Sequence, residues 1–224
     1  MRPVQRGECP QDQNGQEIKF AEYQQARREL IQRMGEYCSY CEMHLDASLA
    51  VEHVQPKKPP GATVAMPERE LDWGNFLLAC TNCNSSKGDT DVVLDDYLWP
   101  DRDDTFRALR YSEGGVVDSA PGMHKARADL LIDLVGLRKQ PDTAEASDRR
   151  WMNRREAWGR AVRAKDRLAI CPTEYTDHMR EQIVETAQDK GFWSVWMTVF
   201  SDDPAMRDRL LQALPGTNSA FFAP

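Results

Sequence analysis

The stretch from Cys38 to Asp89 decides how this chain is interpreted, and it reads CSYCEMHLDASLAVEHVQPKKPPGATVAMPERELDWGNFLLACTNCNSSKGD. It contains two Cys-x-x-Cys pairs, Cys38/Cys41 and Cys80/Cys83. The short spacing within each pair lets both sulfurs reach one metal ion, and four thiolates suit a tetrahedral zinc site. Two pairs of free or disulfide-bonded cysteines are the weaker alternative, because chance rarely produces two such spacings. We therefore predict one structural zinc ion held by all four cysteines.

Between and just after the cysteine pairs lie residues whose side chains can act as a base or bind a metal ion. Glu52 and His53 adjoin in the apolar run 49–54, Asn75 stands alone, and Asn84 directly follows the last cysteine. Phosphodiester hydrolysis, the reaction implied by the family resemblance given below, needs a base that activates water and a cation that stabilises negative charge. His53 is the candidate base, because imidazole titrates near neutral pH. Glu52 and Asn84 offer the hard oxygen ligands that Mg²⁺ or Mn²⁺ prefers.

This order of residues resembles the HNH, or ββα-metal, endonucleases, and the resemblance covers their whole motif. It implies that the Glu52-His53 pair lies on the first strand of a long hairpin whose ends the zinc ties together. It implies that Asn75, in the middle of the motif, braces the hairpin loop and orients His53. Asn84, the third motif residue, would begin a short helix just after the second cysteine pair. Lys87, three residues further on, would contact phosphate or pack near the metal.

The motif departs from the commonest family pattern at two positions. Its first residue is Glu52, where Asp or His is commoner, and its third is Asn84 rather than His. Both still present an oxygen to a cation, so we expect activity with a hard metal ion. Alternation along a strand would turn Glu52 and His53 to opposite faces. The resemblance implies a twisted hairpin that places metal and base on either side of the scissile phosphate.

A narrower resemblance covers about the first half of the chain. The opening MRPVQRG, the run YCSYCE from Tyr37, the run VEHVQPK from Val51 and the run CTNCNSSKG from Cys80 carry it. They resemble the PtuB-like HNH subunits of Septu-type bacterial antiphage systems, including those found beside some retrons. This resemblance implies a defence role and a hetero-oligomer with an ATPase of the ABC/SMC-like class. The chain has no Walker-type Gly-rich loop, so ATP hydrolysis is expected of the partner.

Composition limits the class of protein. The 224 residues permit one large or two small domains, and 41% hydrophobic content is ordinary for a soluble protein. No apolar run approaches the roughly 20 residues that cross a bilayer, and the N-terminus lacks the apolar stretch of a signal peptide. Four of the six cysteines are assigned to zinc, and Cys9 and Cys171 are interpreted as free thiols. This usage predicts a cytoplasmic protein, because the cytosol is reducing.

The net charge of −7 is unexpected for a protein that binds DNA alone, because phosphate contacts need a basic surface. Either the basic residues are concentrated in one part of the chain, or a partner protein supplies many of the contacts to DNA phosphate. The most basic stretch is 145–168, predicted as a long helix with Trp151, Trp158 and Val162 on one side. Its charged face is interpreted as solvated, as a contact to the DNA backbone or as a docking face for an acidic partner.

The other predicted elements surround this motif. Residues 17–34 are expected to form an amphipathic helix. The acidic segment 89–104 is expected to be a solvated linker anchored to the core by Leu94, Tyr97, Leu98 and Trp99. It is followed by a predicted hairpin whose turn is 112–115. Beyond Pro121 the expected helices are 122–138, 145–168, 173–190 and one started by Asp203-Pro204, with the apolar run 192–200 either a buried helix or a partner surface. His44, His124 and His178 are interpreted as packing or surface residues.

The sequence thus predicts an α+β protein in two parts. Residues 1–120 would form the zinc-stapled ββα-metal nuclease domain with its N-terminal helix, and residues 121–224 a mostly helical, partner-docking domain. The first hypothesis is a metal-dependent endonuclease that nicks or cleaves DNA. Two alternatives stay open at this point: a non-catalytic zinc-containing adaptor for nucleic acid or protein, and an HNH nuclease that cleaves RNA or tRNA.

Overall fold

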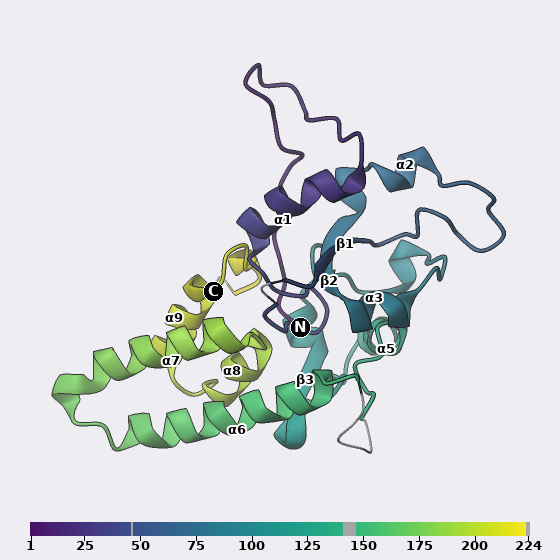
Figure 1. The fold of residues 1–224 in the computed structure, drawn as a ribbon. Coiled ribbons are helices and arrows are strands. Elements are labelled where there is room, and N and C mark those ends of the chain that lie inside the picture. Colours follow the sequence, from purple (N-terminus) through teal and green to yellow (C-terminus); the bar gives the residue numbers. More distant parts are fainter. Residues whose placement is uncertain (46, 141–146, 223–224) are drawn as a thin grey trace.

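A computed structural model describes residues 1–45, 47–140 and 147–222, and over these residues the fold is α+β (Figure 1). Two small antiparallel sheets form: strand β1 (Leu49–His53) pairs with β2 (Phe76–Cys80), and β3 (Leu109–Ser112) pairs with β4 (Val116–Ser119). In Figure 1 the helices α6 to α9 gather on one side of the molecule, and α3 lies with the β1–β2 hairpin on the other. The predicted fold class is confirmed.

The β1–β2 hairpin is buried on both faces. All five residues of β2 are buried, and four of the five in β1 are. Helix α3 (Thr81–Lys87) follows β2 directly, and the Cys80 side chain caps it by accepting from the backbone N–H of Cys83. The prediction that Asn84 begins this helix is wrong by three residues. The cap at Cys80 starts the helix earlier, because a capping side chain satisfies one of the helix's free N–H groups.

The helix predicted over 17–34 is shorter in the structure. A 3-10 turn, η1 (Tyr23–Ala26), leads into α1 (Arg27–Met34), and the residues before η1 are not helical. Gln25 Oε1 accepts from the backbone N–H of Glu22, 3.4 Å away. This local cap fixes the start of the element, because it satisfies a backbone donor that would otherwise belong to a preceding turn of helix.

The segment between α3 and β3 confirms the predicted anchored linker. Leu98 and Trp99 are buried, and Trp99 Nε1 donates to the carbonyl of Leu94 over 3.0 Å. The predicted hairpin is also confirmed, because η4 (Glu113–Gly115) joins β3 to β4. Short helical turns occupy the remaining connections of this part: α2 (Pro67–Glu70), η2 (Trp73–Asn75), η3 (Leu94–Asp96) and α4 (Thr105–Ala108).

The last part of the described chain is helical, as predicted. Its elements are α5 (Lys125–Leu134), α6 (Arg150–Ala169), η5 (Thr173–Tyr175), α7 (Thr176–Lys190), α8 (Trp193–Val199), α9 (Pro204–Ala213) and η6 (Ser219–Phe222). Asp203 caps α9 by accepting from the N–H of Met206, as expected. The apolar run 192–200 is a buried helix rather than a partner surface, because Trp193 and Trp196 are fully buried. Residues 145 and 146 of the predicted long helix lie outside the described residues.

The side of α6 that carries Trp151, Trp158 and Val162 is not its fully buried side. Val162 is exposed, and Trp151 and Trp158 are only half-buried. The side chains of α6 that are buried belong to Arg150, Arg154, Ala157 and Ala161. The two alanines allow close packing against neighbouring helices, and the two arginines find backbone carbonyl partners in the interior. A hydrophobicity pattern cannot indicate a buried arginine, since such a residue depends on acceptors that only the folded chain supplies.

The two predicted domains share one continuous core. The buried apolar cluster includes residues from both ranges, such as Leu78 and Trp196. Val4 forms an isolated antiparallel bridge with Thr217, and the backbone N–H of Phe192 donates to the Glu42 carbonyl over 2.8 Å. The division at residue 120 therefore stays a prediction. None of the helices in the described part of the chain is both long and apolar enough to cross a membrane.

Glu42, which directly follows the first cysteine pair, joins these two parts. Its carboxylate accepts from the backbone N–H of Arg2 (2.9 Å), the hydroxyl of Tyr111 (2.9 Å) and the backbone N–H of Ser194 (2.7 Å). The side chain is buried, and the residue holds the uncommon positive φ of 66°. One carboxylate thus satisfies three buried donors from three distant segments.

Replacement of Glu42 by alanine is expected to lower the free energy of unfolding by about 3–5 kcal/mol. The reason is that each buried donor left unpaired costs about 1–3 kcal/mol. Urea denaturation of Glu42→Ala and of Glu185→Ala, an exposed glutamate on α7, would measure the effect. A loss below about 1 kcal/mol for Glu42→Ala would contradict this account of the residue.

Candidate active site and metal centre

The four cysteines predicted to bind zinc lie together in the interior. The Sγ atoms of Cys38, Cys41, Cys80 and Cys83 all lie within 4.8 Å of one another, and all four residues are buried. Cys41 Sγ and Cys80 Sγ are 3.7 Å apart. That separation is too long for a disulfide, about 2.0 Å, and matches the roughly 3.8 Å between sulfurs on a tetrahedral zinc with bonds of about 2.3 Å. The cluster is consistent with a structural zinc site.

Local backbone geometry prepares both cysteine pairs for a metal. The backbone N–H of Cys41 lies 3.5 Å from Cys38 Sγ, and that of Cys83 lies 3.4 Å from Cys80 Sγ. Such N–H···S contacts favour the thiolate, the form that binds metal. The neighbouring His44 packs against the ring of Tyr37, with centroids 5.1 Å apart, and is not part of the cluster found among the described residues.

Four of the residues predicted to take part in the chemistry line one open hollow of about 280 Å³. Glu52 and His53 reach it from β1, and Asn84 and Lys87 reach it from α3. The pairing of β1 with β2 ends at His53. Glu52 and His53, whose side chains leave opposite faces of the strand, can therefore both line the hollow. Other residues of the wall are Tyr23, Val51, Pro56, Lys57, Lys58, Gly88 and Asp89. Asn75 is not part of the lining.

His53 is held in one tautomer. Its Nε2 lies 3.0 Å from the backbone carbonyl of Glu70. A carbonyl only accepts, so the bond requires the hydrogen on Nε2 and leaves Nδ1 with a free lone pair. The ring is fixed edge-on by its aromatic neighbours, with centroids 4.8 Å from Tyr23 and 5.3 Å from Phe76. Nδ1 is therefore the atom able to take a proton.

The surroundings of His53 favour its neutral form. Burial lowers its pKa below the ordinary value, and the positive charges of Lys57 and Lys87 act in the same direction. The Glu70 carbonyl opposes this effect in part. A lowered pKa keeps the imidazole unprotonated near neutral pH, which is the state that a general base needs.

Glu52 and Lys87 form a buried ion pair. Glu52 Oε1 lies 3.1 Å from Lys87 Nζ, and the side chains are 3% and 1% exposed. Burial raises the pKa of Glu52, and the Lys87 ammonium partly opposes that rise. Oε1 nevertheless has no hydrogen bond of good geometry. A buried carboxylate oxygen short of partners, in the same hollow as the Asn84 amide, fits a hard divalent cation.

Asn75 is buried beneath the loop that connects the two strands. Its Nδ2 donates to the carbonyls of Gln55 and Arg69, each over 2.8 Å, and its Oδ1 accepts from the N–H of Gln55 over 2.7 Å. These bonds join the start of the loop to its end. The residue after Arg69 is Glu70, whose carbonyl holds His53, so the contacts of Asn75 support the backbone that orients the ring.

Sequence reasoning missed two contributors to this arrangement. Tyr23 lies within the range 17–34, which was predicted only as an amphipathic helix, yet its ring contacts His53. Glu70 acts through its backbone carbonyl, so its residue type carries no signal at all. The phosphate contact expected of Lys87 stays a prediction, because the described contact of its Nζ is the ion pair with Glu52.

The match to a known family coincides with this geometry. The sequence profile of the HNH endonuclease family matches residues 38–90. Residues 38–90 are an HNH endonuclease domain. The HNH family consists of nucleases that hydrolyse phosphodiester bonds, so this domain indicates nuclease activity. No curated protein matches the chain significantly.

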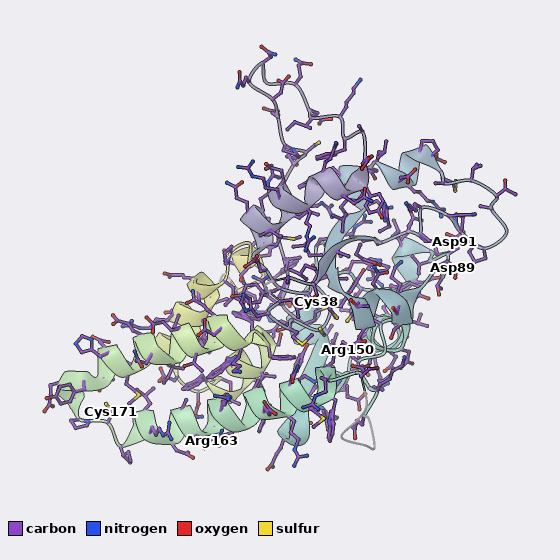
Figure 2. All side chains as sticks on the ribbon, viewed as in Figure 1. Cys38, Asp89, Asp91, Arg150, Arg163 and Cys171 are labelled. Carbon is purple, nitrogen blue, oxygen red and sulfur yellow. The ribbon has the colours of Figure 1, made fainter. Side chains whose placement is uncertain are left out.

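The HNH domain occupies one side of the molecule. Figure 2 shows Cys38 near the middle of the fold, close to Arg150 in this view, and Asp89 and Asp91 beyond α3. Arg163 and Cys171 lie toward the far end of the helical part, away from the HNH domain. Arg163, an exposed basic residue of α6, thus lies far from the hollow that Glu52 and His53 line.

Proposed function

We propose that this chain is a metal-dependent endonuclease that cleaves DNA, with the hollow between β1 and α3 as its active site. The observation that carries the proposal is the juxtaposition of His53, in the tautomer of a base, with Glu52 and Asn84 in the same hollow. Mg²⁺ or Mn²⁺, held by Glu52 and Asn84, would supply a positive charge for the phosphate and the leaving oxygen. The cysteine cluster would hold zinc and fix the hairpin to α3.

Residues of this chain can accept the proton that the attacking water loses. Nδ1 of His53 takes a proton from a water, and the Glu70 carbonyl stabilises the resulting imidazolium through Nε2. Asn75 keeps that carbonyl in place by holding both ends of the loop. Lys57 and Lys58, which also line the hollow, present positive charge toward an incoming phosphate backbone.

The substitution Lys87→Met tests whether Glu52 binds the divalent cation. It leaves the buried carboxylate without its counter-charge, so without divalent metal we expect a loss of about 3–5 kcal/mol of stability. Mg²⁺ bound at Glu52 would restore part of that loss, because a ligand that binds only the folded state stabilises it. Thermal unfolding with and without Mg²⁺ measures this.

The matched control for this test is Lys58→Met, an exposed lysine of the same hollow. Mg²⁺ should raise the melting temperature of Lys87→Met well above the shift that it produces in the control. Equal shifts in the two variants would show that Glu52 is not a ligand of the added metal.

The substrate is tested with supercoiled plasmid, single-stranded DNA and a folded RNA such as tRNA, each with Mg²⁺ or Mn²⁺. Nicking or linearisation of the plasmid supports DNA as the substrate. Cleavage of the RNA alone would replace that substrate by RNA, because a site that contacts phosphate does not by itself distinguish the two.

We further propose that the chain acts in a bacterial antiphage complex with an ATPase of the ABC/SMC-like class, in the cytoplasm. The resemblance of its first half to the PtuB-like subunits of Septu-type systems supports this role. The net charge of −7 supports a partner that supplies part of the grip on DNA. The helical part, with exposed arginines such as Arg160 and Arg163, would be the docking domain. Co-purification with the product of a neighbouring ATPase gene is the test.

A further inference from the structure

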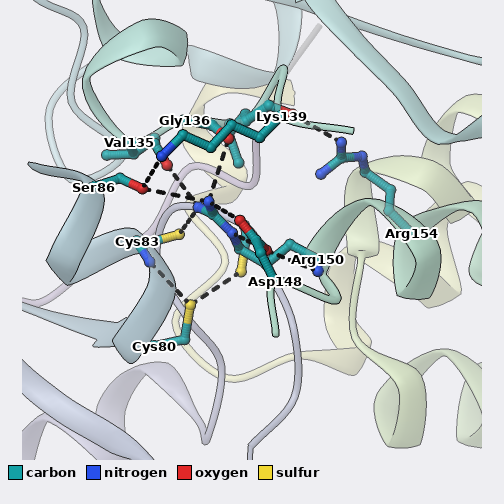
Figure 3. A network of polar contacts seen from close by, with 11 residues as sticks. Cys80, Cys83, Ser86, Val135, Gly136, Lys139, Asp148, Arg150 and Arg154 are labelled. Atoms are coloured by element: carbon teal, nitrogen blue, oxygen red, sulfur yellow. Dashed lines mark hydrogen bonds and ion pairs between the residues drawn. The ribbon is translucent and has the colours of Figure 1, made fainter. Parts of the chain in front are cut away.

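Arg150 contacts the cysteine cluster from outside the HNH domain. It lies at the start of α6, is 2% exposed, and donates from Nη1 to Cys83 Sγ over 3.1 Å. In Figure 3 its guanidinium lies beside Cys83, with Cys80 next to it. A charged side chain that is 67 positions away in the sequence thus reaches one of the four sulfurs.

The rest of the guanidinium is held in place. Nη1 also donates to the Val135 carbonyl over 2.6 Å, and Nη2 lies 3.3 Å from the Gly136 carbonyl. Asp148 accepts from Nε at 2.9 Å and from Nη2 at 2.7 Å (Figure 3). These contacts occupy the whole fork of donors, so the position of the group toward Cys83 is determined and not one of several rotamers.

The net charge of a four-thiolate zinc site explains why the Arg150 guanidinium is favourable beside Cys83. Zn²⁺ with four thiolates carries a net charge of 2 − 4 = −2. Burial makes an uncompensated charge costly, and N–H donors to sulfur reduce that cost. Because Asp148 neutralises part of the Arg150 charge, the contact to Cys83 adds a hydrogen bond and a partial counter-charge.

We propose that Arg150 is a built-in part of the zinc centre: it donates to the Cys83 thiolate, raises zinc affinity, and couples the helical part of the chain to the catalytic helix α3. The inference rests on the zinc proposed above and does not depend on nuclease activity. Cys83 belongs to the same short helix as Asn84 and Lys87. A contact that fixes Cys83 therefore also fixes the side of the hollow that α3 forms.

Two further contacts join α3 to residues that follow α5. Ser86 Oγ accepts from Lys139 Nζ over 3.2 Å and lies 3.5 Å from Arg150 Nη2. Gly136 approaches so closely that a Cβ there would lie 3.0 Å from Ser86 Oγ. Its positive φ of 66° also favours glycine. Gly136 and Lys139, which follow α5, thus pack directly against the helix that carries Cys83.

Arg154 provides a matched control on the same helix. It is also 2% exposed, but Nε donates to the Gly115 carbonyl over 2.7 Å and Nη2 to the Leu137 carbonyl over 3.0 Å. No hydrogen bond to a cysteine is described for it. Arg154→Met therefore removes a buried arginine and its packing while leaving the N–H···S contact of Arg150 in place.

The experiment uses the full-length, zinc-loaded protein. Zinc content is measured first, and then zinc affinity by competition with a chromogenic chelator for wild type, Arg150→Met, Arg150→Lys and Arg154→Met. We expect Arg150→Met to weaken zinc binding by about 10–100-fold, as loss of such outer partners does at other zinc sites. Arg150→Lys should recover part of this loss, and Arg154→Met should bind zinc as wild type does.

Replacement of zinc by cobalt adds a spectroscopic measurement. Loss of packing alone would leave the cobalt spectrum unchanged. Hydrogen bonding stabilises sulfur lone pairs, so its loss should shift the sulfur-to-cobalt charge-transfer band to longer wavelength in Arg150→Met and leave it unchanged in Arg154→Met. If Arg150→Met does not fold, Asp148→Asn replaces it, because Asp148 is partly exposed and orients the guanidinium. That variant should give a smaller change of the same sign.

The outcomes separate the inference from the proposed zinc site. A wild-type protein that holds no zinc overturns both. One bound zinc, with affinity and cobalt spectrum unchanged in the Arg150 and Asp148 variants, overturns the inference alone. Equal weakening by Arg150→Met and Arg154→Met, with no spectral shift in either, would also overturn it, because the effect would then be general destabilisation.

Discussion

His53→Ala is expected to reduce the rate of DNA cleavage by about 10²–10⁴-fold, the range that a positioned general base contributes. The structure supplies the reason, since Nδ1 of His53 is left free by the bond between Nε2 and the Glu70 carbonyl. Single-turnover cleavage of supercoiled plasmid in saturating Mg²⁺ measures the chemical step. Circular dichroism would confirm that the variant folds, because the substitution also removes ring contacts to Tyr23 and Phe76.

The control for this prediction is His178→Ala. His178 lies on α7 with 80% of its side chain exposed, so its loss should leave the rate unchanged. A His53→Ala protein that keeps more than about a tenth of the wild-type rate would rule out His53 as the base. If wild type and variant are both inactive alone, the same comparison is made in the presence of the co-purified ATPase.

Cys41→Ser is expected to have the largest effect on stability. Structural zinc contributes about 10–16 kcal/mol of apparent binding free energy in zinc-finger peptides, and whole domains are stable by only about 5–15 kcal/mol. Loss of one of four buried ligands should therefore leave the protein largely unfolded or aggregated when it is purified. Zinc content and urea denaturation measure the effect, with chelator treatment of wild type as the equivalent test without mutation.

The control for the zinc prediction is Cys171→Ser. Cys171 is a partly exposed free thiol at the far end of α6, away from the cluster (Figure 2). Its substitution should leave the zinc content unchanged. It should change the free energy of unfolding by no more than about 0.5 kcal/mol. A Cys41→Ser protein that retains one zinc and wild-type stability would mean that the four sulfurs do not form the site.

Patterns along the sequence predicted the elements whose cause is local. The cap and proline of Asp203-Pro204 start α9, and the glycines after Ser112 form the turn between β3 and β4. The helix predicted over 17–34 starts later in the structure, because periodicity alone cannot locate a cap. The buried face of α6 was not predicted, for a different reason. Its arginines are buried because carbonyls from distant segments accept from them, and no window of sequence contains those carbonyls.

The residue types of the site were accessible from the sequence, and their contacts were not. Spacing indicated the four cysteines, and the order of the motif indicated Glu52, His53 and Asn84. The ion pair between Glu52 and Lys87 and the carbonyl that selects the His53 tautomer became visible only in the folded chain. A backbone acceptor carries no residue-specific signal, and a pair across two elements depends on how those elements pack.

The sequence by itself determined the HNH motif and the four cysteines that form the buried cluster. This was possible because the two cysteines of each pair are separated by only two residues. That short spacing keeps their two sulfurs close together whatever the rest of the chain does. Only the tertiary structure decided that the helical part shares a core with the nuclease part and places Arg150 on Cys83. Contacts between residues far apart in sequence depend on packing of whole elements, which local pattern does not encode.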